Sequence, residues 1–496
     1  MDSGRVRLPL VVLALFLTSF CYLAGITHPF SRRIYTGIRS LNASDYNQDL
    51  SWIDQCRKGH LALKNLYTSE PQNGFLIRPV TFAISIPFGR THLSNGVVFH
   101  VQRLICGALL LFALFPLLSI YDPSQKIVNI AFALIVFTSG MGALVAGIIS
   151  SADLSIPESS LFLSLGEAPH FAFSFLLLWF GLACYYKAAE TDQAKYFVLY
   201  MVSLALLWFE HPFDAVTSTA VVVANLWHLR ETKWRCVFAL GVVAVSIPFL
   251  LYYQALRNLP QFAGLASAQN LMRTPAPLSM LSAFLPLLVF AILGCIRLKK
   301  VPERSRILWF LVVWIGAQIA LIYSPVPFQR RMMAGIQFPL ALLAAYALDS
   351  WRPAIAVCVI ALCSITNLYV MVGQTRDLSS GQMPYYLPKS YAKAFDWLAA
   401  QDQKGAVLSE FITGNFIPGQ TGFPVYMGHS SLTPEVVRRR KNASAFFRSP
   451  DPDFLKANHV QYIFWGSEER HTSSQPMQTV FKPVYDDEGI AILAAP

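Results

Sequence analysis

Residues 8–26 read LPLVVLALFLTSFCYLAGI, nineteen consecutive residues without a charged side chain. An α-helix needs about 20 apolar residues to cross the hydrocarbon core of a bilayer. The run is long for the apolar part of a signal peptide, and no convincing small-residue cleavage site follows it. It therefore predicts a retained first membrane-spanning helix, preceded by Arg5 and Arg7.

The rest of the chain has the composition of a membrane protein. Of its 496 residues, 54% are hydrophobic and only 14% are charged, against about 25% charged in soluble domains. Ten further apolar runs of roughly spanning length follow, at 97–120, 127–150, 171–186, 196–209, 215–229, 236–256, 278–296, 307–323, 333–348 and 354–372. The sequence thus predicts a polytopic α-helical membrane protein with about eleven transmembrane helices.

The formal net charge of +11 does not indicate nucleic-acid binding, because most Lys and Arg residues lie in short loops between apolar runs. Basic short loops face the cytosol and contact anionic lipids. A cytosolic N-terminus places the basic short loops on the inner side and most acidic residues in longer outer loops. Two basic pairs break this pattern, at 32–33 and 330–331.

Two segments differ from the apolar runs. The first outer loop, 28–96, is far longer than a helix connection requires. The segment 374–496 predicts a small extracytoplasmic α/β domain, outside a transmembrane domain at 1–373. Its expected helices are 390–400 and 434–447, and its expected strands are 406–408, 424–427, 460–465 and 489–493.

The first outer loop contains S-D-Y-N-Q-D at 44–49. Asp45 and Asp49 are four residues apart, so on a helix they share one face. They are candidate catalytic carboxylates. The structural alternative is that acidic residues in a helix's first turn simply favour the helix dipole.

Other ionisable residues lie at predicted helix ends on the same outer side. Glu210, His211 and Asp214 stand in E-H-P-F-D, and Glu158 and His170 lie near the start of the run at 171. Ionisable groups at a membrane boundary are costly unless they are paired or used, so they are candidate substrate-binding residues. The structural alternative is helix capping and local hydrogen bonding.

Arg330 and Arg331 precede the run at 333–348. A cationic pair at a helix N-terminus opposes the helix dipole unless an anion binds there. Guanidinium groups and helix N–H groups both suit a phosphate. The alternative is that both side chains extend to lipid headgroups.

These residues together resemble the GT-C superfamily of membrane glycosyltransferases, and an uncharacterised bacterial branch of it. The resemblance covers most of the membrane part and rests on Asp45 in the first loop, N-L-Y-T-S-E-P at 65–71, E-H-P-F-D at 210–214 and F-Q-R-R-M-M-A-G-I-Q-F-P-L at 328–340. It implies an inverting sugar transfer from a polyprenyl-phosphate-linked donor among membrane lipids, on the periplasmic side of a bacterial inner membrane. It also implies that Asp45 is the general base and that the two arginines hold the departing phosphate.

The resemblance leaves some points open. Tyr46, rather than a second acid, follows Asp45, so whether a divalent cation acts as cofactor is not predicted. A secondary transporter is the alternative from another class, but it predicts repeats and charges within helices, whereas the charges here lie at helix ends. A lipid-linked polysaccharide polymerase or ligase is a second alternative, which usually has its large outer loop later in the chain.

Overall fold

The computed structural model describes residues 3–28, 30–38, 43–229, 232–262 and 271–496. In this part of the chain, eight helical segments are long and apolar enough to cross a membrane. They are α1 (Ser3–Thr27), α4 (Asn95–Tyr121), α8 (Pro169–Thr191), α11 (Thr232–Arg257), α13 (Pro277–Leu298), α14 (Ser305–Ile322), η8 with α15 (Gln329–Met333 and Gln337–Leu348), and α16 with α17 (Pro353–Cys363 and Ile365–Leu378). The predicted polytopic helical fold is confirmed, whereas the count of eleven spans is not.

The remaining three predicted runs form shorter helices, α5 (Gln125–Phe137), α9 (Ala194–Glu210) and α10 (Pro212–Asn225). The prediction of one continuous run at 127–150 is wrong, because α5 ends at Phe137 and only the short α6 (Gly142–Val145) follows. The buried carboxylate of Asp153 accepts hydrogen bonds from the backbone N–H groups of Gly140 and Gly142, at 2.8 and 3.2 Å. This carboxylate stabilises a turn where the sequence suggested a helix.

A second correction concerns the run at 333–348. The α-helix begins at Gln337, after the 3-10 turn η8 (Gln329–Met333) and Gly335, whose φ is +84°. Left-handed backbone of this kind favours glycine and interrupts a right-handed helix. Arg330 and Arg331 therefore lie in a separate turn and not at the N-terminus of α15.

The chain forms two compact units, each described here by itself. Unit 1 comprises 1–23, 103–250 and 272–376. At its centre every residue of α15 is buried, and α15 packs on α13 and α5. A Cβ on Gly294 of α13 would lie 1.8 Å from the carbonyl oxygen of Leu343. Glycine is therefore required for the close approach of these two helices, as is common in membrane bundles.

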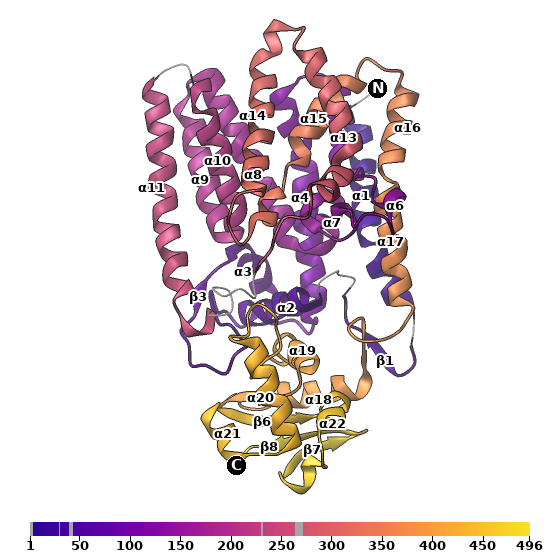
Figure 1. Ribbon diagram of the computed structural model, residues 1–496, viewed down its shortest axis with the longest axis vertical. Coiled ribbons are helices and arrows are strands. Elements are labelled where there is room, and N and C mark those ends of the chain that lie inside the picture. The colour runs from indigo at the N-terminus through magenta and orange to yellow at the C-terminus, as the bar shows by residue number, and fades with distance from the viewer. Residues whose placement is uncertain (1–2, 29, 39–42, 230–231, 263–270) are drawn as a thin grey trace. The chain divides into compact units, whose positions relative to one another are not determined.

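Unit 2 comprises 24–102, 251–271 and 377–496, so it combines most of the first loop with the C-terminal segment. The predicted domain boundary at residues 373–374 stays a prediction. A four-stranded sheet has the order β5-β6-β8-β7, with β5 (Ala406–Leu408) parallel to β6 (Val460–Trp465) and the pairs with β8 (Ile490–Ala494) antiparallel (Figure 1). The edge strand β7 (Pro483–Asp487) was not predicted.

Helices pack against both faces of this sheet. Ile463 and Trp465 of β6 share a core with Phe446 and Phe447 of α20 (Val436–Arg448) and with α21 (Pro452–Ala457). Phe464 points to the opposite face, where it contacts α18 (Lys389–Ala399) through rings 5.5 Å apart. The alternation along β6 follows from the two-residue period of a strand. This confirms the predicted C-terminal α/β fold.

Candidate active site

The helix α2 (Ala43–Arg57) carries both candidate carboxylates, with Asp45 in its first turn and Asp49 one turn later. The helix packs on α19 (Phe411–Thr421) of the same unit. A Cβ on Gly419 of α19 would lie 2.9 Å from both the carbonyl oxygen of Asn47 and the Cβ of Leu50. The close contact that glycine permits here fixes the position of α2, and hence of both carboxylates.

Asp49 is buried and forms an ion pair with Arg78. Arg78 has a left-handed backbone, with φ +50°, just before α3 (Pro79–Ser85), and its guanidinium lies 4.7 Å from the ring centre of Trp52. Burial raises the pKa of Asp49, while Arg78 opposes that rise and Asp45 adds to it. Asp49 thus lies in an enclosed, structured ion pair.

The side chain of Asp45 is 51% exposed, and its Oδ1 lies 3.2 Å from Nε2 of His429. His429 is buried, and its Nδ1 accepts hydrogen bonds from the backbone N–H groups of Ser431 and Leu432, at 3.1 and 3.2 Å. In neutral imidazole one nitrogen accepts and the other donates. We therefore assign the proton to Nε2, which donates it to Asp45.

Buried polar side chains hold His429 in place. Thr433 Oγ1 accepts from the N–H groups of residues 428 and 429, both at 3.1 Å, and donates to the carbonyl of Tyr67. Asn415 donates to the carbonyl of Gly428, and Asn47 donates to Asn415 Oδ1 at 2.7 Å. Burial, with the nearby Asp45 and Asp49, raises the pKa of Tyr67 well above its ordinary value. Its hydroxyl stays a donor, to the carbonyl of Asn415 at 3.1 Å.

Sequence reasoning missed His429, Arg78 and Asn415. A single histidine in G-H-S-S-L and an arginine before a proline carry no motif. Tyr67 lies in the N-L-Y-T-S-E-P segment already singled out, where buried Asn65 donates to the carbonyls of Gln261 and Leu432. This segment links three stretches of unit 2 that are far apart in the sequence.

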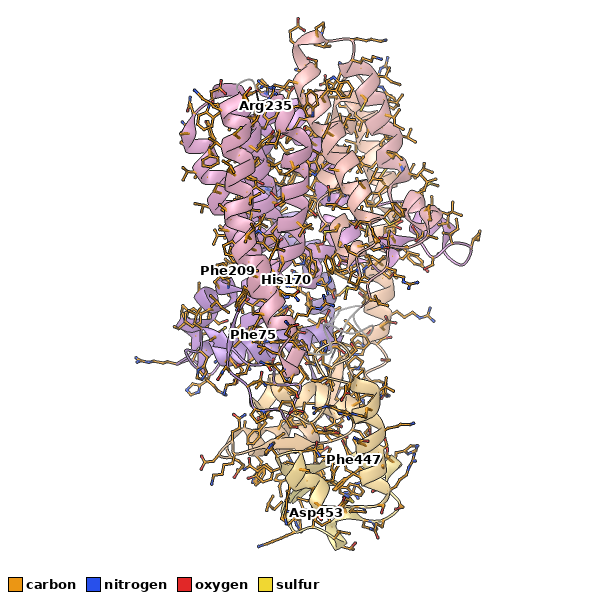
Figure 2. The ribbon with its side chains drawn as sticks, turned by 60° about the vertical axis from the view of Figure 1, so that its left-hand side comes forward. Phe75, His170, Phe209, Arg235, Phe447 and Asp453 are labelled. Carbon is orange, nitrogen blue, oxygen red and sulfur yellow. The ribbon has the colours of Figure 1, made fainter. Side chains whose placement is uncertain are left out.

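Unit 1 gathers the second group of predicted residues. His211 ends α9 and Asp214 lies in the first turn of α10, where its Oδ2 accepts a hydrogen bond from Ser174 of α8. The rings of His170 and His211 are 5.7 Å apart, and Glu210, next to His211 in sequence, is buried. Figure 2 shows His170 of α8 and Phe209 of α9 near each other, and Arg235 near the start of α11, toward the opposite end of the helices.

The arginine pair lies near this group. The Arg331 guanidinium is 4.7 Å from the ring centre of Phe213, and its Nε is 2.9 Å from Sδ of Met272. Arg330 Nη2 is 3.9 Å from Oε1 of buried Glu158. A hollow too narrow to hold a water molecule adjoins them, lined by Glu158, Ser160, Leu161, Phe175, Trp179, Gly335 and Gln337.

Several buried polar atoms in this group have no hydrogen-bond partner within the described residues. They are both ring nitrogens of His211, Oδ1 of Asp214, Oε2 of Glu158, Nε of Arg330 and Nε1 of Trp179. The His211 Nδ1 lies 3.0 Å from Asp214 Oδ2, but outside hydrogen-bond geometry. Buried polar atoms are nearly always satisfied in native proteins. These atoms are therefore the candidates for hydrogen bonds to a ligand or to water.

The structure thus places Asp45 and Asp49 in unit 2, and the seven other candidates in unit 1. The convergence of the two groups on one site stays a prediction. Across the described ranges, no group of three or more His, Cys, Asp or Glu side chains has the arrangement to hold a metal ion.

The fold defines a class: the chain is a polytopic helical membrane protein with a C-terminal α/β part, and solved structures share this fold. It is similar to ArnT from Cupriavidus metallidurans in the apo state, with a TM-score of 0.56 and 12% identity, over 99% of this chain and 98% of that one. It is also similar to the same protein bound to undecaprenyl phosphate, with a TM-score of 0.54 and 12% identity over 100% and 99% of the two chains.

A third similar structure is the arabinofuranosyltransferase AftD from Mycobacteria, with a TM-score of 0.51 and 14% identity. The likeness covers 98% of this chain but 40% of AftD. No protein-family model and no curated protein matches the sequence. At these identities the likenesses establish the fold, and the activity has to be argued from the site.

Proposed function

We propose that this protein is an inverting membrane glycosyltransferase, which moves a sugar from a polyprenyl-phosphate-linked donor to an acceptor on the extracytoplasmic side. The observation that carries the proposal is the half-exposed carboxylate of Asp45, oriented by His429 in a GT-C fold. A general base has to reach the substrate's proton, and Asp45 is exposed enough to do so. Asp49 is buried and ion-paired with Arg78, which suits a supporting role.

The proposed step is a single displacement. The acceptor hydroxyl gives its proton to Asp45. At the same time the acceptor oxygen attacks the anomeric carbon of the sugar from the face opposite the phosphate. The bond between that carbon and the phosphate oxygen breaks, and polyprenyl phosphate leaves with the bonding electrons. The configuration at the anomeric carbon is inverted, and the developing charge on the leaving phosphate needs stabilisation.

The arginine pair supports this assignment of the leaving group. Guanidinium groups bind phosphate oxygens through paired N–H donors, and Arg330 Nε has no partner among the described residues. The dipole of α15 adds nothing here, because the pair precedes that helix in a separate turn. The similar ArnT structure bound to undecaprenyl phosphate supports a donor of this chemistry.

His211, Asp214, Glu210, Glu158 and His170 would orient the donor or the acceptor in this scheme. The buried atoms of His211, Asp214 and Glu158 that have no hydrogen-bond partner among the described residues suit the hydroxyl groups of a sugar. We further propose a bacterial inner-membrane location with the active site and C-terminal domain in the periplasm. Accessibility labelling of single cysteines introduced at 300 and 440 tests this orientation, and labelling of residue 440 from the cytosol alone would contradict it.

The activity test uses the full chain in liposomes, with a panel of polyprenyl-phosphate sugars and candidate acceptors. We expect transfer from at least one donor and its loss in Asp45→Asn. The matched control is Asp54→Asn, since Asp54 lies on the same helix and pairs with Lys58 at the surface. Transport of a solute with no donor consumed would overturn the proposal in favour of a transporter.

A further inference from the structure

The contact between Asp45 and His429 joins residues 384 positions apart within unit 2. We propose that His429 is a positioning residue for Asp45, and that its Nε2–H holds the base carboxylate in the orientation and the ionised state that transfer requires. The inference rests on the proposed function, in which Asp45 accepts the proton. It gives the C-terminal segment a direct part in the reaction.

The surroundings of the imidazole make it a fixed donor. Two backbone N–H groups point at Nδ1, so a proton on that nitrogen would displace both hydrogen bonds. Nε2 already bears a proton, through which it donates a hydrogen bond to Asp45. It therefore cannot accept the proton that Asp45 removes from a substrate. His429 therefore orients the carboxylate and does not relay protons, unlike the histidine of a nucleophilic triad.

A donor at this position is needed because of the charges nearby. Asp49, which pairs with Arg78, and the phenol of Tyr67 both interact electrostatically with this carboxylate. A second carboxylate one helical turn away disfavours ionisation of Asp45, and a hydrogen bond to the charged form opposes that effect. His429 is nearly fully buried, so water is excluded from the imidazole side of the hydrogen bond, while the Asp45 carboxylate stays half exposed.

Two substitutions separate the two ends of the imidazole. In His429→Asn the side-chain oxygen can still accept from the backbone N–H groups two and three residues ahead, as Asn does in turns, but it is too short to reach Asp45. In His429→Gln the longer amide can reach Asp45 as a donor, but it loses the local acceptor. His471→Asn is the control, because His471 is an exposed histidine of the same unit.

Two readouts are measured against pH. The first is the transfer rate, and the second is modification of Asp45 by a carbodiimide, followed by mass spectrometry. For His429→Asn we expect the acidic limb of kcat and the half-titration point of Asp45 to move up by roughly one pH unit, because the variant loses a hydrogen bond that favours the charged carboxylate. We also expect kcat of His429→Asn to fall roughly tenfold. In His429→Gln and His471→Asn, the acidic limb of kcat and the half-titration point of Asp45 should both stay near their wild-type positions.

The proposal would be overturned if His429→Asn folds and shifts neither the acidic limb of kcat nor the half-titration point of Asp45. It would also be overturned if the Asn and Gln variants shift these two quantities equally. If His429→Asn does not fold, Thr433→Val decides, because it loosens the backbone that holds His429. A smaller shift in the same direction supports the proposal, and no shift overturns it. If the wild type transfers no sugar, the proposed function fails, while Asp45 modification still reports on His429.

Discussion

The two units each contain a histidine beside an aspartate, and the two pairs are built differently. In unit 2, Nε2 of His429 lies 3.2 Å from a half-exposed Asp45, and the imidazole is held by backbone amides. In unit 1, His211 lies 3.0 Å from Asp214, both are buried, and neither ring nitrogen of His211 has a hydrogen-bond partner within the described residues.

The difference in exposure suits the two aspartates to different roles. A carboxylate that is exposed and oriented can take a proton from a substrate, as a general base must. The buried Asp214 instead joins α8 to α10 through Ser174, while the open nitrogens of His211 can receive a ligand's hydroxyl groups. In the proposed scheme Asp45 of unit 2 is the base, and His211 and Asp214 of unit 1 bind the donor or the acceptor.

The largest effect should come from Asp45→Asn. The amide keeps the shape of the side chain but cannot accept a proton, so kcat should fall by about 10²–10⁴-fold. Asp49→Asn should have a milder effect on transfer, because Asp49 does not contact the substrate in this scheme. Steady-state transfer assays with both variants measure the difference.

Folding is the necessary control for this comparison. Asp45→Asn should match the wild type in expression, membrane insertion and thermal unfolding, because its side chain is half exposed. Near wild-type turnover in this variant would remove Asp45 as the base and make Asp49 or Asp214 the next candidate.

Asp214→Asn should show the opposite pattern. The carboxylate accepts a buried hydrogen bond from Ser174, and bonds to charged groups contribute about 1.5–3 kcal/mol to stability. We expect a lower melting temperature and weaker donor binding, with a smaller loss of kcat than in Asp45→Asn. A loss of kcat as large as that of Asp45→Asn, at unchanged stability, would reverse the roles assigned to the two pairs.

The sequence predicts those elements that depend on interactions between residues close together in the chain, and it fails where the contacts join distant positions. Long apolar runs predicted α1 and α4 closely, and short apolar runs predicted β5 and β6 with their observed bounds. The predicted strand at 424–427 forms only an isolated parallel bridge between Val425 and Val407, with hydrogen bonds from Val407 N–H to the carbonyl of Pro424 and from Tyr426 N–H to the carbonyl of Val407. On its other side the N–H of Val425 donates to the carbonyl of Leu66 in the first loop, a contact remote in sequence that no local pattern could reveal.

The same reason applies to the candidate site. Asp45 was found because its loop is long and acidic, and Arg330 and Arg331 because they break the charge pattern. His429 was missed because its role depends on a contact across 384 positions. A single sequence reports helical spacing well, but not which distant loop approaches a helix.

The third effect is a pH dependence of unit 2. Burial, and the neighbouring Glu468, raise the pKa of Glu469 from 4.5 to about 7, while its carboxylate accepts from the N–H groups of Glu410 and Gly466. The folded state thus keeps a proton that the unfolded chain releases near pH 4.5. The stability that this proton provides is complete below pH 4.5 and is lost as pH rises to about 7.

The expected loss of stability over that window is at most about 3 kcal/mol. Thermal unfolding of the full chain in detergent, from pH 4.5 to 7.5, measures it, with Glu469→Gln as the variant that should flatten the dependence. The two pH effects have opposite signs and can therefore be told apart. Protonation of Asp45 lowers the transfer rate as pH falls, whereas ionisation of Glu469 lowers the stability of unit 2 as pH rises. An unchanged slope in Glu469→Gln would remove Glu469 as the cause.

The smallest effect should come from Arg330→Lys and Arg331→Lys, and it tests whether unit 1 binds a phosphate. If the two side chains only reach lipid headgroups, lysine serves as well, since a point charge is sufficient there. If they hold a donor phosphate, lysine loses the paired N–H geometry. One charge-assisted hydrogen bond contributes about 1.5–3 kcal/mol, so donor affinity or transfer rate should fall roughly tenfold or more. Arg352→Lys, at an exposed position, is the control. Unchanged donor binding and transfer in both variants would favour the headgroup alternative and remove the strongest reason for a phosphate-linked donor.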